Sequence, residues 1–272
     1  MTTVSDTPGF LSADEDSPFA AHAYIASMAR SGSTLLCNIF SKAPTHWMVV
    51  EPWFMTGATT PRLADTALQF GVVDTAADWH VLSRQRTADR LRQRYRDMLA
   101  PGLSRLERWG AKEVRFDFHE PTISMIRPRH IVINTRDIRE VYLSHREKAV
   151  RQGKDDEQSP EWAATYCLKN SAAMVGLMAK LGERLTTIAR YEDFAHSQHE
   201  RQRIADLIDW PLVGDEAGQL KQIDRGYEVQ RHSNQKPVKL TAEMRGLSED
   251  EVRIADEVAE RCTDYQNAFG YR

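Results

Sequence analysis

The sequence has few cysteines and no spacing that would let them work together. Its 272 residues include three, Cys37, Cys167 and Cys262, and no two of them form a Cys-x-x-Cys pair. Such scarcity argues against a disulfide framework and against zinc bound by paired cysteines, and it favours a reducing compartment. We predict that each cysteine is a small core residue on a helix.

Long apolar runs are missing as well. No stretch approaches the roughly 18 consecutive apolar residues of a membrane-spanning helix. Residues 1–20 are acidic and rich in Ser and Thr, without the apolar block of a signal peptide. We therefore predict a flexible tail over residues 1–20, a single domain over residues 21–272, no membrane span and a cytoplasmic location.

The chain also lacks a strong excess of charge of either sign. Its formal net charge is −3, and 28% of its residues are charged. This balance offers no general attraction to nucleic acid or to a membrane surface, so any anion site must be local. The hydrophobic content of 41% fits one soluble domain with a sizeable core.

Five short apolar runs are present, and helical patterns lie between them. The runs fall at residues 22–28, 46–50, 109–114, 130–134 and 185–190. Their alternation with helices predicts an α/β fold, with a parallel central sheet flanked by helices on both faces. Because such sheets bind ligands at the carboxyl ends of their strands, the polar segments that follow the runs are the candidate functional sites.

The first run leads into the most informative segment of the chain. This turn consists of Arg30, Ser31, Gly32, Ser33, Thr34 and Leu35. It opens a helix that we predict to reach about Lys42, and it presents backbone N–H groups and side-chain donors to an anion. A Walker A loop would need a Lys directly before its hydroxyl residue, and none is present. The predicted guest of this P-loop-like turn is a phosphate or sulfate group.

A second polar segment follows the run at 130–134. Arg136 stands directly before a predicted helix, and Ser144 lies about two turns into it. Asp137 has the character of an N-cap residue, with Glu140 as its partner in a capping box.

Together the two segments resemble the donor-binding motifs of PAPS-dependent sulfotransferases, PAPS being 3′-phosphoadenosine 5′-phosphosulfate. The turn at 30–35 is similar to their 5′-phosphosulfate loop. Residues 136–144 are similar to their 3′-phosphate motif, R-D-P-R-D-V-x-x-S, with Ile138 in place of the Pro. The resemblance spans residues 22–212 and the terminal helix, and it points to bacterial members of the trehalose and carbohydrate sulfotransferase branch.

The resemblance implies roles for particular residues. Residues 30–35 would bind the 5′ end of PAPS, and Arg136 and Ser144 would bind the 3′-phosphate. A third segment is similar to a late strand of the family, which implies that Tyr191 contacts the adenine, although packing beneath the strand explains this tyrosine equally well. Arg231 is the candidate for the basic loop that relatives close over the 3′-phosphate.

The family transfers the sulfuryl group without a metal, so cationic side chains and backbone amides must stabilise the moving charge. Arg30 holds the position where relatives carry a Lys or Arg beside the 5′-phosphate and the bridging oxygen. Lys112, in the run at 109–114, matches a Lys that many relatives place on the sulfate side. An ordinary Lys at the end of a strand is the alternative interpretation.

The acceptor hydroxyl needs a general base. Glu51, at the end of the second run, corresponds to a Glu that trehalose sulfotransferase and the heparan sulfate 3-O-sulfotransferases use. His119 is the second candidate, because cytosolic relatives use a His soon after the Lys, but that position is held here by Val114. Glu113 and Asp117 are two further candidates.

The resemblance therefore implies a PAPS-dependent sulfotransferase that acts on a hydroxyl of a small molecule or carbohydrate. A P-loop kinase-like phosphotransferase and a non-catalytic PAP(S)-binding module are the alternatives, PAP being the desulfonated product. The acceptor and the oligomeric state stay open, a homodimer included. The sequence further predicts a mobile loop at residues 146–160 and a long amphipathic helix at residues 248–268.

Overall fold

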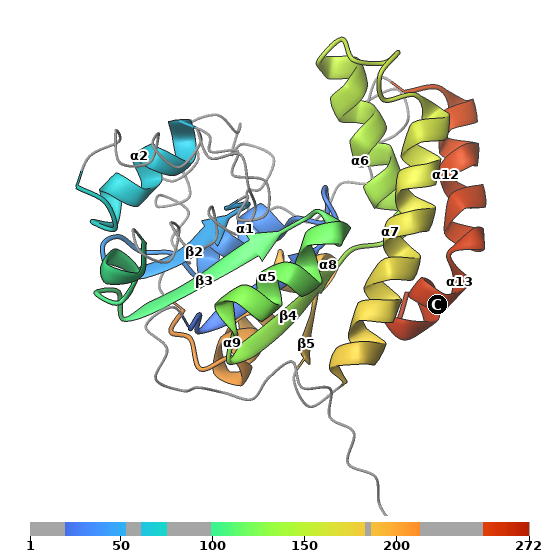
Figure 1. Ribbon diagram of the computed structural model, residues 1–272. Coiled ribbons are helices and arrows are strands. Elements are labelled where there is room, and N and C mark those ends of the chain that lie inside the picture. The colour runs from blue at the N-terminus through green and yellow to red at the C-terminus, as the bar shows by residue number, and fades with distance from the viewer. Residues whose placement is uncertain (1–19, 53–60, 75–98, 183–185, 213–246, 272) are drawn as a thin grey trace, which may run out of the picture.

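The computed structural model describes residues 20–52, 61–74, 99–182, 186–212 and 247–271. Its strands are β1 (Ala23–Ser27), β2 (His46–Val50), β3 (Arg108–Glu113), β4 (His130–Thr135) and β5 (Thr186–Arg190). They form one parallel sheet in the order β2-β3-β1-β4-β5 (Figure 1). The five apolar runs of the sequence are these five strands, which confirms the predicted α/β fold.

β1 lies at the centre of the sheet, where the connectivity reverses. From β1 the chain passes to β2 and β3 on one side, and β4 and β5 follow on the other side. In open parallel sheets, ligands bind at such a reversal, outside the carboxyl ends of the strands. The fold therefore brings the segments after β1, β3 and β4 to one place.

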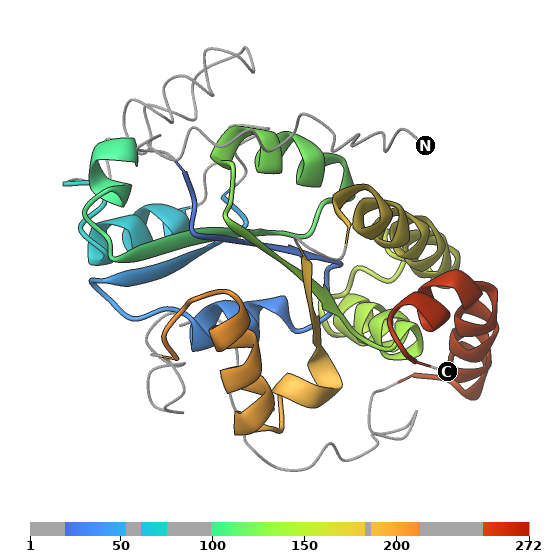
Figure 2. The same ribbon diagram turned by 90° about the horizontal axis from the view of Figure 1, so that it is seen from below.

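Helices cover both faces of the sheet. α1 (Ser33–Ile39) and α9 (Gln198–Leu207) lie on one face, and α5 (His119–Ile126) lies on the other (Figure 2). α6 (Ile138–Arg151), α7 (Pro160–Leu181) and α12 (Glu249–Arg261) pack together beside the sheet (Figure 1). The other described helices are α2 (Pro61–Gln69), the 3₁₀ helix η2 (Phe116–Phe118), α8 (Tyr191–Phe194) and α13 (Thr263–Ala268). Across the described ranges, no helix has the length and apolar character needed to cross a membrane.

β1 is buried on both faces, as expected for a central parallel strand. Tyr24 and Ala26 pack into a core cluster that includes residues of α5 and α7. Ala23 and Ile25 pack into the other cluster, which includes residues of α1 and α9. This alternation determines which side chains of the neighbouring strands share a face with each helix.

All three cysteines are buried and free. Cys37 and Cys167 lie within α1 and α7, as predicted. Cys262 lies at a break between two helices. The single helix predicted for residues 248–268 is divided there into α12 and α13. The backbone of Cys262, with φ of −94° and ψ of 37°, departs from helical geometry and causes the break.

The helix after the first turn is shorter than predicted. α1 ends at Ile39 and does not reach Lys42. Ser41 explains the early end, because its Oγ donates to the Cys37 carbonyl (2.8 Å) and accepts from the Met48 N–H (3.0 Å). These two bonds direct the chain out of the helix and toward β2.

The loop predicted for residues 146–160 is shorter than predicted and spans residues 152–159. α6 continues to Arg151, and α7 begins at Pro160. Arg146 is buried at 2% exposure, and its guanidinium contacts Glu251 Oε1 (2.7 Å), the Gln158 carbonyl and Asp155. A buried guanidinium needs such partners, so the connection between α6 and α7 is anchored to α12.

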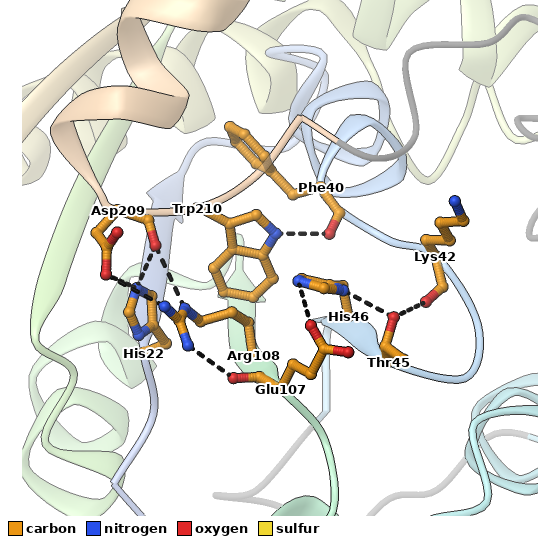
Figure 3. A network of polar contacts seen from close by, with 9 residues as sticks. All are labelled: His22, Phe40, Lys42, Thr45, His46, Glu107, Arg108, Asp209 and Trp210. Atoms are coloured by element: carbon orange, nitrogen blue, oxygen red, sulfur yellow. Dashed lines mark hydrogen bonds and ion pairs between the residues drawn. The ribbon is translucent and has the colours of Figure 1, made fainter.

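The amino edge of the sheet carries a polar network (Figure 3). His22 immediately precedes β1, and its Nε2 lies 2.8 Å from the Asp209 carbonyl. Arg108, the first residue of β3, pairs with the Asp209 carboxylate at 3.3 Å. Trp210 lies in the same network, and its Nε1 donates to the Phe40 carbonyl at 2.9 Å. The segment after α9 is thereby fastened to the amino ends of the strands.

Candidate active site

The turn between β1 and α1 has two residues in left-handed backbone conformations. Arg30 has a φ of 71° and Gly32 a φ of 77°. Gly32 is required for a second reason, because a Cβ there would lie 2.1 Å from Cδ2 of Tyr191. Arg30 does have a Cβ, so its conformation costs roughly 1–2 kcal/mol and must be held by its surroundings.

Two residues of the second motif hold Arg30. Its Nε donates to Ser144 Oγ at 3.0 Å, and its carbonyl accepts from Nη1 of Arg136 at 3.1 Å. The strands that precede the two motifs, β1 and β4, are adjacent and parallel. The cation of the turn and both residues predicted to bind the 3′-phosphate therefore lie together, although they are far apart in the sequence.

The Arg136 guanidinium lies between the turn and the start of α6. It pairs with Glu140 at 3.3 Å and lies over the ring of Tyr191 at 4.5 Å. Its Nε is buried and has no hydrogen-bond partner among the described residues. A buried donor without a partner costs free energy, so this nitrogen is a place where a bound acceptor would be stabilising.

α6 begins at the predicted residue but without the predicted capping box. Asp137 is the N-cap, and its carboxylate accepts from the Arg139 N–H at 2.9 Å. Glu140 pairs with Arg136 instead, and the Asp137 N–H donates to Glu192 Oε1 at 2.9 Å. The N-cap is confirmed, whereas the capping role of Glu140 is wrong because Glu192 of α8 supplies that acceptor.

Asn134 is a site residue that sequence reasoning missed. It lies near the end of β4 at 0% exposure, and its Nδ2 donates to Ser27 Oγ (3.0 Å) and to the Ser31 carbonyl (2.9 Å). Its own Oδ1 and the Ser31 Oγ are buried without partners among the described residues. The signal that could have found it is a polar amide within an otherwise apolar strand.

Tyr191 begins α8 directly after β5. Its ring lies against Gly32 and beneath the Arg136 guanidinium, so it joins the turn to the second motif. Contact of this tyrosine with adenine stays a prediction.

The remaining predicted loop residues lie in the first turn of α1: Ser33, Thr34 and Leu35. Arg231 lies outside the described residues.

Glu51 and Lys112 form an ion pair at the carboxyl ends of β2 and β3. Lys112 Nζ donates to Glu51 Oε1 at 2.6 Å, and the Glu51 N–H donates to the Lys112 carbonyl at 2.8 Å. Lys112 is only 1% exposed, and a buried charge needs a partner. Glu51 keeps 31% of its side chain exposed, and its Oε2 makes no hydrogen bond within the described part of the chain.

This ion pair lies on the face of the sheet that α1 covers. Lys112 is in register with Ile25 of β1, whose side chain packs with α1. Cys37 of α1 lies close enough to sense both charges. Burial raises the pKa of this thiol to about 12, while the charge of Lys112 lowers it and the charge of Glu51 raises it.

His119 belongs to the opposite face. Its Nδ1 lies 2.7 Å from the hydroxyl of Tyr24, which packs with α5 and α7. The ring is 1% exposed, and burial lowers the pKa of His119 to about 4. Because a general base must reach the substrate, this placement favours Glu51 over His119 for that role.

The two further candidate carboxylates have different surroundings. Glu113 is 1% exposed, and its Oε1 accepts from the N–H groups of Val114 (2.8 Å) and Arg115 (3.1 Å). Burial is the main cause that raises the pKa of Glu113. Asp117 has 75% of its side chain exposed and faces Arg115 at 3.9 Å. Glu113 thus caps its own strand end, and Asp117 lies at the surface.

The polar atoms left over at this edge fit an anionic ligand. Arg136 Nε and Ser31 Oγ are buried donors without partners in the described structure, one beside each motif. A phosphate or sulfate oxygen would supply an acceptor to each of them. Among the described residues, no group of His, Cys, Asp and Glu side chains could hold a metal ion.

The fold is similar to that of solved sulfotransferase domains. The sulfotransferase domain from the curacin biosynthetic pathway has a TM-score of 0.53 and 16% identity, over 88% of this chain and 98% of that domain. The sulfotransferase domain from the Synechococcus olefin synthase has a TM-score of 0.47 and 14% identity, over 87% of this chain and 94% of that domain. No protein-family model and no curated protein sequence matches the chain. The first likeness shows that the chain has the fold of a sulfotransferase domain.

Proposed function

We propose that this protein transfers a sulfuryl group from PAPS to a hydroxyl of a small-molecule or carbohydrate acceptor, without a metal ion. The observation that carries the proposal is the contact of Arg136 with the Arg30 carbonyl at 3.1 Å. It sets the second basic motif against the anion-binding turn, so one ligand with an anionic group at each end would fit both. The sulfotransferase fold supports the same proposal.

The turn would hold the 5′ end of the donor. Gly32, Ser33 and Thr34 present the first N–H groups of α1, which have no partner within the helix. When bound, PAPS supplies the sulfuryl group, and its phosphate is the leaving group. Arg30 contributes a positive charge beside these N–H groups, where negative charge grows on the leaving oxygen.

Glu51 would take the proton from the acceptor. The acceptor oxygen forms a bond to sulfur as the bond between sulfur and the bridging oxygen breaks, and the hydroxyl proton passes to the Glu51 carboxylate. Lys112 donates to Oε1 at 2.6 Å, which leaves Oε2 for the acceptor. The buried Lys112 would therefore orient the partly exposed Glu51 carboxylate and place a positive charge near the reaction.

Thermal shifts with PAP and AMP test the donor. PAP should raise the melting temperature, because a ligand that binds only the native state stabilises it. AMP lacks the 3′-phosphate and should raise the melting temperature much less. Equal shifts would refute the assignment of the 3′-phosphate site, and a shift that requires Mg²⁺ and ATP would favour the P-loop phosphotransferase.

A binding module without catalytic activity would also respond to PAP. Release of PAP from PAPS, followed with a panel of small alcohols and sugars, separates the two functions. An enzyme should release PAP faster with at least one acceptor, and the same acceptor should gain a sulfate group by mass spectrometry. PAP binding without any such turnover would support the binding module.

A further inference from the structure

Ala29, the residue before Arg30, is held by a side chain of α7. Its N–H donates to the hydroxyl of Tyr166 at 2.8 Å. The imidazole of His145 in α6 packs against the ring of Tyr166. Neither side chain belongs to the residues that the resemblance assigned to the donor.

Tyr166 and His145 form a packed pair. Their ring centroids are 4.5 Å apart, and Tyr166 also stacks on Trp162 at 5.5 Å. His145 is 6% exposed, and burial, followed by the charge of Arg30, lowers the pKa of His145 to about 3. The imidazole is therefore neutral at pH 7, and it packs against Tyr166 without adding a charge beside Arg30.

Arg30 needs such support because its left-handed backbone is unfavourable for a residue with a Cβ. Ser144 holds its side chain and Arg136 holds its carbonyl. Both are also the proposed ligands of the 3′-phosphate, and a bound nucleotide would compete with the Arg30 carbonyl for the Arg136 guanidinium. The hydrogen bond from the Ala29 N–H to Tyr166 would persist, because Tyr166 is not among the proposed ligands.

We propose that Tyr166 is a positioning residue, supported by the packed ring of His145, and that it holds Ala29 and so keeps Arg30 in its left-handed conformation when Arg136 binds the nucleotide. This inference rests on the proposed function. Tyr166 acts through the backbone of the turn. Its loss should therefore weaken every ligand that uses the turn, whatever group it carries at its 3′ end.

The central experiment compares Tyr166→Phe with Tyr142→Phe. Tyr142 in α6 is a matched control, because it is fully buried and its hydroxyl has no partner among the described residues. Calorimetry should show that Tyr166→Phe weakens PAP and AMP alike, by about 3- to 10-fold, as expected for one lost hydrogen bond. Tyr142→Phe should leave both affinities unchanged. Arg136→Ala, in contrast, should change the ratio of the PAP and AMP affinities.

A second measurement concerns the free protein. The amide hydrogen of Ala29 should exchange faster with solvent in Tyr166→Phe and at the wild-type rate in Tyr142→Phe. His145→Ala, which removes the ring packed against Tyr166, should weaken both nucleotides, and His145→Phe, which keeps an aromatic ring there, should restore part of the loss.

The outcomes separate this inference from the proposed function. A wild-type protein that binds neither PAP nor AMP would overturn the proposed function, and the inference with it. If the wild type binds both nucleotides but Tyr166→Phe matches Tyr142→Phe in both affinities and in Ala29 exchange, the inference alone is overturned. Faster exchange with unchanged affinities would likewise overturn the positioning role.

Discussion

The two edges of the sheet differ in how they treat buried polar groups. At the carboxyl edge, side-chain polar atoms of Ser31, Asn134 and Arg136 are buried without partners in the described structure. At the amino edge, none of the 9 residues drawn in Figure 3 contains such an atom. Because an unpartnered buried polar atom costs free energy, a bound anion would stabilise the donors of Ser31 and Arg136, and the network drawn in Figure 3 has no such need.

Left-handed residues other than glycine occur at both edges, and two of them, Asp209 and Arg30, are held differently. At the amino edge Asp209 has a φ of 48°, and its contacts with His22 and Arg108 come from the strands themselves. At the carboxyl edge the side chain and carbonyl of Arg30 are held by Ser144 and Arg136, the residues proposed to bind a ligand. Strain at Asp209 is thus supported by permanent structure, and strain at Arg30 by groups with a second task.

Among variants that test the difference between the two edges, Glu51→Gln at the carboxyl edge should have the largest effect, a loss of turnover. Glutamine keeps the shape of the side chain and can still accept from Lys112, but it is not basic. Turnover should fall by about 10²-fold or more, while PAP affinity stays within a few-fold. The rate of PAP release with an identified acceptor measures the first quantity, and calorimetry measures the second.

His119→Asn is the control for the base. His119 lies on the other face of the sheet, so this variant should have a mild effect on turnover. Near-normal turnover of Glu51→Gln beside an inactive His119→Asn would reverse the assignment. A joint loss of stability and PAP binding in Glu51→Gln would instead identify Glu51 as a structural partner of Lys112.

The next effect concerns the nucleotide. Arg136→Ala should remove a charge-assisted contact with the 3′-phosphate, worth roughly 1.5–3 kcal/mol, or about 10- to 150-fold in PAP affinity. AMP, which lacks this phosphate, should lose affinity only through the lost support of the Arg30 carbonyl, and therefore much less than PAP does. Equal weakening of PAP and AMP in calorimetry would show that Arg136 does not recognise the 3′-phosphate.

The sequence predicted the carboxyl edge better than the amino edge, for a physical reason. Arg30 and Arg136 lie in short segments whose residue types suit one purpose, and adjacent parallel strands must bring such segments together. The ion pair of Glu51 and Lys112 was not predicted, although both residues were singled out separately. Pairing depended on the register of β2 against β3, which places Glu51 beside Lys112, and the sequence alone does not determine that register.

Other contacts were hidden because they join distant segments through ordinary residues. Tyr166 and His145 lie in helical sequence with no motif, and only the packing of the fold brings Tyr166 to Ala29 and His145 to Tyr166. The network of His22 and Asp209 had no sequence signal either, since neither a histidine before a strand nor an aspartate after a helix indicates a partner. Local chemistry was visible in the sequence, and partners across the fold were not.

The histidines at the amino edge should make the stability of the protein depend on pH. Burial, assisted by the charge of Arg108, lowers the pKa of His22, and burial lowers the pKa of His46. The unfolded chain then binds more protons than the native protein below about pH 6.5, so stability should fall as the pH drops from 7 to 5.

His22→Gln tests this dependence. Glutamine can donate to the Asp209 carbonyl but does not bind a proton, so the melting temperature should fall by a few degrees less between pH 7 and pH 5 than in the wild type. His119 and His145 are also buried, with pKa values lowered to about 4 and about 3, so part of the dependence should remain. A melting curve with unchanged pH dependence in His22→Gln would show that His22 does not contribute.

The smallest effect is expected from Arg108→Ala. The pair of Arg108 with Asp209 is exposed, with 35% and 74% of the two side chains accessible, and such pairs contribute at most about 1 kcal/mol. The melting temperature should fall by no more than roughly 2–4 °C, and the difference from the wild type should shrink at high salt. PAP affinity should not change, because the nucleotide is proposed to bind at the opposite edge. A loss of PAP affinity in Arg108→Ala would mean that the two edges are coupled through β1 and β3, and the division between a stabilising edge and a ligand-binding edge would then fail.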